Sequence, residues 1–365
     1  MGGSESMKIH YLVTSLETGG AEFSIPEVVT ALQRQGHDVH VIACEPRDMG
    51  AAPRLDAAGL DYRVLSSKRR PLPVVLGKYL NVIRKDRPDI IWTSLSWGTR
   101  IGQWAGRITR TPVISFKHSA SVRPATYRMR YMSKLWIGDS QTVVHYLNEE
   151  MGIPQSDTLP LPLYISDENA PSATGWDGKS RLELGSVGRL HKVKNYDQLI
   201  KGVALFIHQH PEWKHQLHLT IAGEGAERVT LEKMIRQLKL EEIVSLPGHS
   251  DEINRFLSGL HLYAQPSRYE GMCLAAHEAM NAALPVMATP VGELRYDVED
   301  NNTGFILKGN ISQAICLALE QVFTTPEILA YYGRNAQDYV RRTFSKDKFE
   351  QAISTISSRL DQYVK

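Results

Sequence analysis

The stretch PSRYEGMCLAAHEAM occupies residues 266–280 and follows an apolar run from Leu260 to Gln265. The apolar run predicts a buried strand, and the polar residues after it predict a turn. From Gly271 onward the residues favour a helix, so the segment predicts a strand, a turn and a helix in succession. Strand, turn and helix in this order are typical of parallel α/β sheets.

Two carboxylates, Glu270 and Glu278, bracket seven residues of this stretch. If those residues are helical, the carboxylates stand about 12 Å apart along the helix axis. The first helical amides would lack intrahelical partners and carry the positive end of the helix dipole, which favours a bound phosphate. The residues that carry these amides are Gly271, Met272, Cys273 and Leu274. The predicted order of hydroxyl acceptor, phosphate cradle and hydroxyl acceptor suits a nucleotide sugar.

Composition indicates a globular protein of about two domains, because 365 residues with 42% hydrophobic and 22% charged residues can bury two cores. The three cysteines, Cys44, Cys273 and Cys316, show neither C-x-x-C spacing nor nearby histidine pairs, so they indicate no disulfide framework and no zinc site. No apolar run approaches the length of about 18 residues that spans a membrane. Residues 1–6 are too short and polar for a signal peptide, so we expect Met7 as the natural start and a cytoplasmic location.

Apolar runs alternate with amphipathic stretches along the whole chain, which predicts an α/β protein with doubly wound sheets. We predict a first domain at 7–168, a linker at 169–180 that is rich in Pro, Gly, Ser and Asp, a second domain at 181–344 and a last helix at 345–365. The predicted strands, six in each half, are 8–14, 38–43, 61–65, 90–93, 112–116 and 135–138, then 182–187, 217–222, 243–246, 260–265, 285–289 and 304–307.

Paired glycines, Gly19 and Gly20, follow the first predicted strand and precede a helix that we expect to end at Gln35. Glycines let a backbone approach a ligand closely, and the helix that follows offers its N-terminus. For these two glycines alone, a tight turn that needs positive φ angles is the favoured interpretation. Both interpretations stay open at this point.

Two cations follow the first strand of the second half, where Gly188 and Arg189 are succeeded by Lys194 five residues later. Open α/β sheets bind ligands at the carboxyl edge of their strands, so both side chains are expected to converge there. A guanidinium grips phosphate oxygens in pairs, and an ammonium adds a point charge. Lys192 is a further cation in this loop, although the register favours Lys194. Surface charges without a ligand are the alternative reading.

Further glycine turns follow the next two predicted strands. They contain Gly223 with Glu224, and Pro247 with Gly248. Such turns let a planar base and a ribose lie against backbone, although they are common in proteins generally. In the first half, His118 directly follows the strand at 112–116, so it is expected at the carboxyl edge of the first sheet, facing a cleft between the domains. A structural histidine is the competing interpretation.

These segments together resemble the retaining, nucleotide-sugar-dependent glycosyltransferases of the GT-B fold, which include bacterial lipopolysaccharide, capsule and mannosyl transferases. Glu270 and Glu278 match the E-x7-E motif of this family, GGAE at 19–22 resembles its glycine loop, and GRL at 188–190 with Lys194 matches its phosphate-binding segment. The motifs recur in order over residues 8 to about 310. The resemblance implies two Rossmann-like domains facing each other across a cleft, and a last helix that crosses back to the first domain.

The resemblance also implies a division of roles among the site residues. Glu270 would orient the donor sugar, and Glu278 would hold the ribose hydroxyls. Arg189, Lys194 and the 271–274 amides would stabilise the departing diphosphate. His118 would hydrogen-bond a sugar hydroxyl near the reacting carbon, and the glycine turns would hold the nucleobase through main-chain groups.

The chain departs from the family pattern at two places. Ala283 replaces the glycine that ends the E-x7-E helix, and we expect a slightly different helix cap to absorb this change. Val291-Gly292 replaces a Gly-Gly pair beside the donor-sugar region. The second departure bears more directly on the site.

The reaction implied is the transfer, with retention, of a sugar from a nucleoside diphosphate, UDP favoured over GDP, to a glycan or lipid-linked acceptor. No Asp-x-Asp pair or histidine cluster is placed to hold a divalent cation, so we predict that no metal or other cofactor takes part. A nucleotide-sugar epimerase and a non-catalytic glycan-binding module of the same fold are the alternative functions.

The segment from Lys68 to Lys134 carries fifteen Lys or Arg residues against two acids, although the whole chain has a formal net charge of only +2. Six aromatic residues lie among these cations, and a surface of this kind attracts anionic lipid headgroups. A solvated helical face explains the charge equally well. We favour an anionic or lipid-linked acceptor at the cytoplasmic membrane face over a nucleic acid, because no recognition motif accompanies the charge. The aromatic residues are Trp92, Trp97, Trp104, Tyr127, Tyr131 and Trp136.

Overall fold

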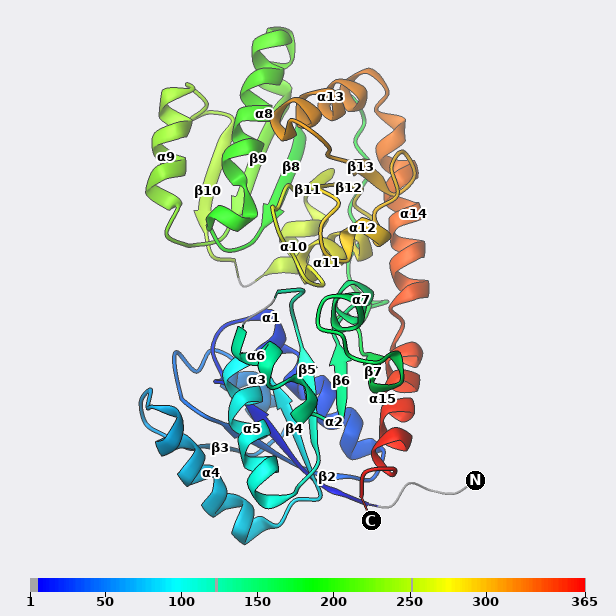
Figure 1. Cartoon of the computed structure of the whole chain (residues 1–365). Helices are drawn as coiled ribbons and strands as arrows, with labels where there is room; N and C mark the ends of the chain where they lie inside the picture. Colours follow the sequence, from blue (N-terminus) through cyan, green and yellow to red (C-terminus); the bar gives the residue numbers. More distant parts are fainter. Residues whose placement is uncertain (1–5, 122–123, 251, 365) are drawn as a thin grey trace. The chain divides into compact units, whose positions relative to one another are not determined.

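The computed structural model describes residues 6–121, 124–250 and 252–364, which form two compact units (Figure 1). The first unit runs to Leu163 and takes in the chain again from Lys346, and the second spans Tyr164–Ser345. The predicted linker at 169–180 lies inside the second unit, where the indole of Trp176 is buried in the core. Residues 1–5 and Arg123 of the basic segment lie outside the described residues.

The first unit is built on a seven-stranded sheet in the order β3-β2-β1-β4-β5-β6-β7. Every pairing in this sheet is parallel. The strands are β1 Lys8–Val13, β2 Asp38–Ala43, β3 Tyr62–Val64, β4 Ile90–Ser94, β5 Val113–Lys117, β6 Leu135–Gly138 and β7 Thr158–Pro160.

Helices connect most of these strands, because parallel neighbours need a crossover connection. They are α1 Gly20–Phe23, α2 Ile25–Arg34, α3 Ala52–Ala57, α4 Leu72–Asp86, α5 Ser96–Thr109, α6 Pro124–Arg128, η1 Arg130–Met132, α7 Gln141–Glu149, η2 Gln155–Asp157 and α15 Lys346–Leu360. The helix expected to continue to Gln35 is therefore divided at Ser24, which precedes Pro26 at the start of α2.

The second unit repeats the plan with six parallel strands in the order β10-β9-β8-β11-β12-β13. Its strands are β8 Leu182–Val187, β9 Leu217–Ala222, β10 Val244–Gly248, β11 Leu262–Gln265, β12 Val286–Ala288 and β13 Gly304–Ile306. Its helices are η3 Lys192–Lys194, α8 Tyr196–Gln209, η4 Pro211–Gln216, α9 Arg228–Gln237, α10 Ile253–Ser258, α11 Leu274–Asn281, α12 Leu294–Asp297, α13 Ile311–Thr324 and α14 Glu327–Thr343.

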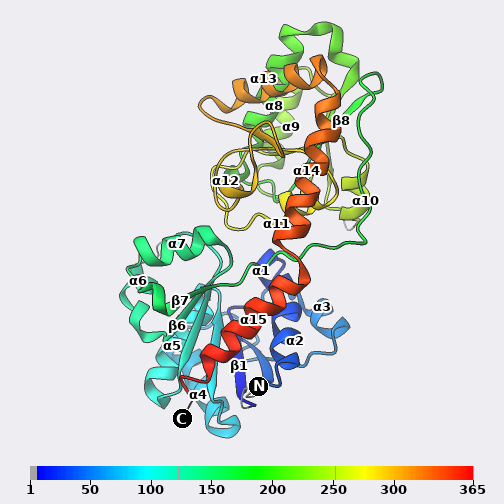
Figure 2. The same ribbon diagram turned by 90° about the vertical axis from the view of Figure 1, so that its right-hand side faces the viewer.

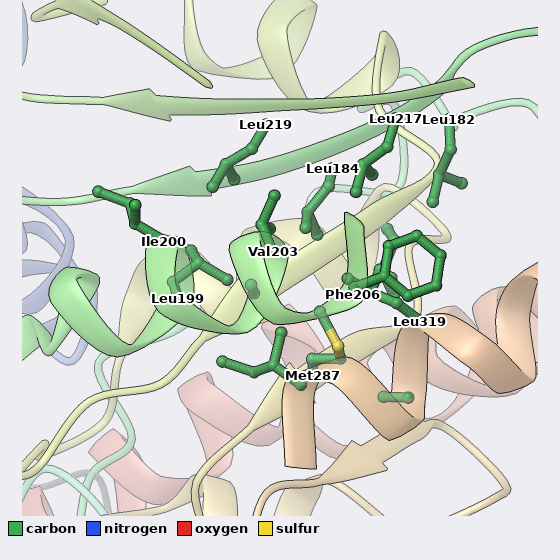
Figure 3. Close-up of a cluster of buried hydrophobic side chains, with 14 of the residues drawn as sticks. Leu182, Leu184, Leu199, Ile200, Val203, Phe206, Leu217, Leu219, Met287 and Leu319 are labelled. Carbon is green, nitrogen blue, oxygen red and sulfur yellow. The ribbon is translucent and has the colours of Figure 1, made fainter. Parts of the chain in front are cut away.

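Helix α8 covers the second sheet through an apolar face. Its buried side chains recur at the helical spacing and point toward β8 and β9, with Leu319 of α13 and Met287 of β12 closing the cluster (Figure 3). Full burial of one such side chain stabilises the fold by about 1.5–3 kcal/mol. The α8 residues in this cluster are Leu199, Ile200, Val203 and Phe206.

The last helix, α15, belongs to the first unit and packs on α2 (Figure 2). Arg34 of α2 forms an ion pair with Glu350, and the buried ring of His37 contacts the hydroxyl of Ser357 at 2.6 Å. The chain therefore enters the second unit at residue 164 and returns to the first after residue 345.

All twelve predicted strands are present, and the α/β prediction with two Rossmann-like units is confirmed. Strand β7 was not among the predicted strands. It has three residues, ends in a proline and lies at the sheet edge, where a missing N–H is tolerated. In the described part of the chain, no helix has the length and apolar character to cross a membrane.

Helix α11 begins at Leu274, three residues later than predicted. Cys273 has a left-handed backbone with φ 59°, so Gly271, Met272 and Cys273 form a turn rather than the first turn of the helix. The axial separation expected between Glu270 and Glu278 therefore does not apply, because Glu270 lies outside the helix.

The expectation of a different helix cap at Ala283 is wrong. Ala283 has φ 59°, and the amide of Leu284 donates to the Ala279 carbonyl at 3.0 Å, which is the hydrogen bond of a Schellman cap. The chain therefore keeps the left-handed cap that suits glycine and places an alanine in it, at a cost of about 1–2 kcal/mol.

Candidate functional site

The second unit brings Lys194 and Glu270 together at the carboxyl edge of its sheet. Strands β8 and β11 are neighbours, but β9 and β10 extend the sheet on one side and β12 and β13 on the other. The loops that leave β8 and β11 therefore diverge and leave a crevice, the usual ligand position in open α/β sheets. Lys194 lies in the β8 loop and Glu270 in the β11 loop, and their charged atoms are 2.7 Å apart.

Three donors converge on a single oxygen of the Glu270 carboxylate. Oε1 accepts hydrogen bonds from Lys194 at 2.7 Å, from the amide of Gln265 at 2.9 Å and from the hydroxyl of Ser267 at 2.5 Å. Tyr263 in turn donates to Gln265 at 3.0 Å, so the network is fixed from inside the sheet. The thiol of Cys273 also hydrogen-bonds the Glu270 carboxylate, so a fourth protein group helps to hold it.

Lys194 keeps its charge although it is largely buried. Burial disfavours the ammonium, but Cys273 and Glu270 outweigh it, so the pKa of Lys194 is raised. Burial also raises the pKa of the Cys273 thiol, which is therefore neutral at ordinary pH. The Glu270 carboxylate is consequently the group that holds the lysine charge in place.

Arg189 and Lys192 differ from Lys194 in their surroundings. Both side chains are exposed, and among the described residues neither has an ion-pair partner. Arg189 follows β8 directly, so it extends from the same edge of the sheet as Lys194. A flexible exposed cation of this kind is available to an incoming anion.

The glycine turns after β8, β9 and β10 pack backbone against backbone. The Gly223 amide donates to the Gly248 carbonyl at 2.7 Å, and the Gly188 amide donates to the Ala222 carbonyl at 3.0 Å. A Cβ at Gly223 would lie 2.0 Å from the Gly188 oxygen, so only glycine fits there.

The side chains on these turns face outward to different degrees. Pro247 is exposed beside Gly248, while the carboxylate of Glu224 pairs with Arg228 at 2.7 Å. The Glu224 carboxylate is thus already paired with a cation, whereas the turns contact one another through main-chain hydrogen bonds. Main-chain recognition of a base remains a prediction.

Gly292 lies directly against the turn that follows Glu270. Its φ is 57°, and a Cβ there would come within 2.3 Å of the Gly271 oxygen and 2.8 Å of the Glu270 oxygen. The amide of Glu293 also donates to the Gly271 carbonyl at 3.0 Å. The second glycine of the family pair is therefore required at this position, and Val291 occupies the place of the first.

Glu278 lies in the second turn of α11 and is half-buried. Tyr164 is close to it, and the pKa of Tyr164 is raised, first by burial and then by the charge of Glu278. The proposed contact between Glu278 and ribose hydroxyls stays a prediction.

In the first unit, His118 follows β5 and both of its ring nitrogens face protein groups. Nε2 is 2.7 Å from the hydroxyl of Ser94, at the end of β4, and Nδ1 is 3.6 Å from the carboxylate of Asp139, just after β6. Nδ1 of His118 and Oδ1 of Asp139 are buried without a hydrogen-bond partner. A sugar hydroxyl would therefore have to displace Ser94 or use Nδ1, a condition that the sequence did not reveal.

A pocket borders His118 at the carboxyl edge of the first sheet. Hydroxyl groups dominate its polar lining, and the ring of Phe116 packs on the imidazole with centroids 4.3 Å apart. A pocket with several hydroxyls and one imidazole suits a polar, hydroxyl-bearing ligand. The hydroxyl residues that line it are Ser96, Thr99, Ser119 and Thr126.

The glycine loop of the first unit encloses a carboxylate that sequence reasoning did not single out. Neither Gly19 nor Gly20 has a positive φ, so the tight-turn interpretation is wrong. Instead, a Cβ at Gly19 would lie 2.3 Å from Oε2 of Glu22, so the glycine makes room for this side chain. Glu22 is only 5% exposed, and burial raises its pKa to about 7.

Three further candidate residues were not predicted from the sequence. Gln265, Ser267 and Asp139 become candidates only through their hydrogen-bond geometry. Of these three residues, only Asp139 could have been suggested by the sequence. It directly follows strand β6, just as His118 directly follows strand β5, so both lie at the carboxyl edge of the first sheet.

Two family models match this chain. The model described as "Glycosyl transferases group 1" covers residues 168–339, and the model described as "Glycosyltransferase Family 4" covers residues 18–161. The matches follow each other without overlap and correspond closely to the two structural units. Each unit of the chain is therefore similar to a glycosyltransferase family model, the second to group 1 and the first to family 4.

Relatives with names include the lipopolysaccharide core biosynthesis mannosyltransferase LpcC of Rhizobium leguminosarum bv. viciae, 28% identical over 202 residues, which are 53% of this chain and 54% of the relative. The D-inositol 3-phosphate glycosyltransferase of Corynebacterium glutamicum is 24% identical over 90% of this chain and 89% of its own. The chain thus spans about half the length of the first relative.

The fold also matches solved structures along nearly its whole length. Anabaena Alr3699/HepE in complex with UDP superposes with a TM-score of 0.82 at 21% identity, covering 97% of this chain and 100% of the other. The apo form of the lipopolysaccharide outer core galactosyltransferase WaaB gives a TM-score of 0.77 at 15% identity, with coverage of 97% and 100%. At these identities the likeness establishes the fold.

The stability of the Glu270 turn is predicted to depend on Gly292. Gly292→Ala should lower the free energy of unfolding by about 3 kcal/mol or more, because strain at positive φ adds to an overlap with the Gly271 oxygen. Gly309→Ala is the matched control, since Gly309 has φ 70° but nothing within 4 Å of its Cβ position. That variant should lose only about 1 kcal/mol. Urea unfolding of both variants measures the difference. Equal losses of unfolding free energy would show that the close approach to the Gly271 oxygen does not affect stability.

Glu22 is predicted to make stability depend on pH. Its pKa is about 7 in the folded chain against 4.5 in the unfolded chain, so the folded state holds the proton longer. Stability should therefore fall as pH rises from about 4.5 to 7, by an amount on the order of 3 kcal/mol. Glu22→Gln should abolish this part of the pH dependence, and Glu27→Gln, on an exposed carboxyl of α2, should not. Parallel stability curves for wild type and Glu22→Gln between pH 5 and 8 would contradict the assignment.

Proposed function

We propose that the protein transfers a sugar from a nucleoside diphosphate, UDP favoured over GDP, to a glycan or lipid-linked acceptor, with retention of anomeric configuration and without a metal. The observation that carries the proposal is the Glu270 carboxylate, which three protein donors to Oε1 hold in one orientation at the switch point of the sheet. An oriented acceptor oxygen of this kind suits a sugar hydroxyl better than it suits a phosphate.

The diphosphate would lie between Arg189 and the 271–274 turn. Cleavage of the sugar–phosphate bond places negative charge on the leaving group, and preorganised cations and amides lower that barrier. Arg189 has no competing ion pair among the described residues, so its guanidinium is free to grip phosphate oxygens. Glu278, in the second turn of α11, would receive the ribose hydroxyls. The departing phosphate would accept the proton of the acceptor hydroxyl.

Metal independence rests on the protein cations beside the proposed diphosphate site. Arg189 supplies a positive charge that no described carboxylate offsets, and Lys194 adds an ammonium held beside Glu270, where a divalent ion would otherwise neutralise the phosphates. Among the described residues, no group of three or more His, Cys, Asp or Glu side chains is arranged to hold a metal ion.

For the acceptor, we propose attraction to an anionic membrane surface through the first unit. Helix α5 exposes Trp104 and Ile108, and Arg130 lies over the rings of Tyr127 and Tyr131 at 4.0 and 4.2 Å. Helix α5 contacts both α6 and η1, so these exposed groups come from adjoining elements. Two of the aromatic residues grouped with them in the sequence, Trp92 and Trp136, are instead buried in the sheet. The protein would then act at the cytoplasmic face of the membrane.

Nucleotide-sugar binding is predicted to depend on Lys194 and not on Lys192. A donor at 100 times its Kd should stabilise the wild type by about 2.7 kcal/mol in a thermal screen of UDP- and GDP-sugars. Lys194→Met should abolish most of this gain, because an uncompensated Glu270 would then face the phosphates. Lys192→Met, two residues away and exposed, should retain it.

Turnover assays complete this test. Sugar transfer should continue in EDTA, and NMR of the product should show the anomeric configuration of the donor. Conversion of the donor in the absence of acceptor would favour the epimerase alternative. A wild type that no nucleotide sugar stabilises would refute the proposal.

Membrane attraction is predicted to require the exposed tyrosines of the first unit. The wild type should float with vesicles that contain phosphatidylglycerol and not with pure phosphatidylcholine, because cations near an anionic surface gain up to about 1 kcal/mol each. Replacing Tyr127 and Tyr131 together by Ser should lower the floated fraction several-fold. Tyr296→Ser is the control, since Tyr296 is 52% exposed in the second unit. Equal flotation with both lipids would refute the attraction.

A further inference from the structure

A chain of hydrogen bonds runs through the interior of the second unit and ends at the turn after Glu270. Tyr339 of α14 donates to Oδ1 of Asp297 at 2.5 Å, and Oδ2 of Asp297 is 2.7 Å from Nε2 of His277. Nδ1 of His277 is 3.0 Å from the carbonyl oxygen of Cys273. His277 is 0% exposed and Asp297 is 3% exposed, so this pair is buried, while Tyr339 at the far end of the chain is half-buried.

The partners of His277 determine its protonation. A carbonyl oxygen only accepts hydrogen bonds, so Nδ1 must carry a proton to bond with Cys273. Asp297 already accepts from the Tyr339 hydroxyl, and its second oxygen accepts from a protonated Nε2. Both ring nitrogens therefore carry protons, and His277 is an imidazolium paired with a carboxylate.

The surroundings of His277 agree with that charge. Burial lowers its pKa, but the hydrogen bond and charge of Asp297 outweigh burial, with smaller support from the Cys273 carbonyl and Glu293, so the pKa of His277 is raised. The rings of Tyr164 and Phe344 pack on the imidazole at centroid distances of 5.4 and 5.1 Å. An ion pair enclosed in this way breaks only at a large cost, because one charge would be left buried and unpaired.

The carbonyl that His277 holds belongs to the residue with the least favourable backbone in the turn. Cys273 is left-handed at φ 59° and precedes α11 without a side-chain cap. Its carbonyl also accepts from the amides of Ala276 and His277. Because C=O and N–H of one peptide point in opposite directions, a carbonyl fixed toward the helix directs the Leu274 N–H out of it.

We propose that His277 is a positioning residue whose imidazolium, held by Asp297 and Tyr339, fixes the 271–274 turn so that its amides face the diphosphate of the donor. This inference rests on the proposed function for the identity of the anion. It adds a role for three side chains that lie behind the turn and do not themselves contact the ligand.

The structure of the turn can be tested without any ligand. In the wild type, nitrogen-15 NMR should show two ring N–H protons on His277, and the hydrogen-bonded amides of Arg268, Ala276 and His277 should exchange slowly. His277→Gln and Asp297→Asn should speed exchange of these amides at least tenfold, because the Cys273 carbonyl loses its charged donor. Tyr339→Phe, a milder change at the far end, should give a smaller increase. A single ring proton in the wild type, or unchanged exchange in His277→Gln, would overturn the inference.

Ligand affinity supplies the second measurement, with UDP, GDP and pyrophosphate as probes in calorimetry. His277→Gln should weaken the tightest-binding probe five- to twentyfold. His261→Gln is the matched control, because His261 is also partly buried and accepts from the Glu183 amide at 3.0 Å, but lies at the opposite end of β11 from Glu270. It should lower stability and leave affinity unchanged.

The two measurements separate the possible failures. Equal affinity in wild type and His277→Gln would overturn the positioning role while the proposed function stands. A wild type that binds none of the three probes would refute the proposed function, and the exchange data would then decide alone whether His277 fixes the turn.

Discussion

The ion pair between Lys194 and Glu270 holds together two loops that the sheet sends in opposite directions. Strand β8 is the first of its unit and β11 is the fourth, and because the two strands are neighbours their loops begin side by side before they diverge. The ammonium and carboxylate are 2.7 Å apart and mostly buried, and removal of either would leave a buried charge without a partner. Gln265 and Ser267 bind the same oxygen, so the positions of all these side chains depend on the pair.

Each unit carries a buried histidine beside an aspartate, and the two pairs differ in a way that matches their proposed roles. His277 and Asp297 are 2.7 Å apart and fully hydrogen-bonded, which suits a fixed support behind a phosphate site. His118 and Asp139 are 3.6 Å apart, and an atom of each is buried without a hydrogen bond. Unsatisfied buried atoms are costly, so they mark a place where a ligand or a small shift would gain hydrogen bonds.

The fold could be predicted from sequence because alternation of apolar runs and amphipathic stretches is a local property. The motif residues were also found locally, and Glu270 and Lys194 lie together although 76 residues separate them. The start of α11 could not be predicted, because a left-handed cysteine has no sequence signal. The Glu22 carboxylate, the Ser94 and Asp139 partners of His118 and the Tyr339–Asp297–His277 chain depend on tertiary packing, which spacing along the chain does not reveal.

The charge balance at the Glu270 turn explains why backbone groups matter there. Lys194 is already neutralised by Glu270, and the charge of His277 is balanced by Asp297, so neither pair presents a large net charge to a diphosphate. If a diphosphate binds here as proposed, Arg189 is the exposed cation that meets it, and amide dipoles, whose effect depends on orientation, supply the rest of the attraction. A turn that rotated freely would lose that contribution even with every side chain intact. Three separate features restrict this rotation. They are the left-handed backbone of Cys273, the close approach of Gly292 and the hydrogen bond from His277.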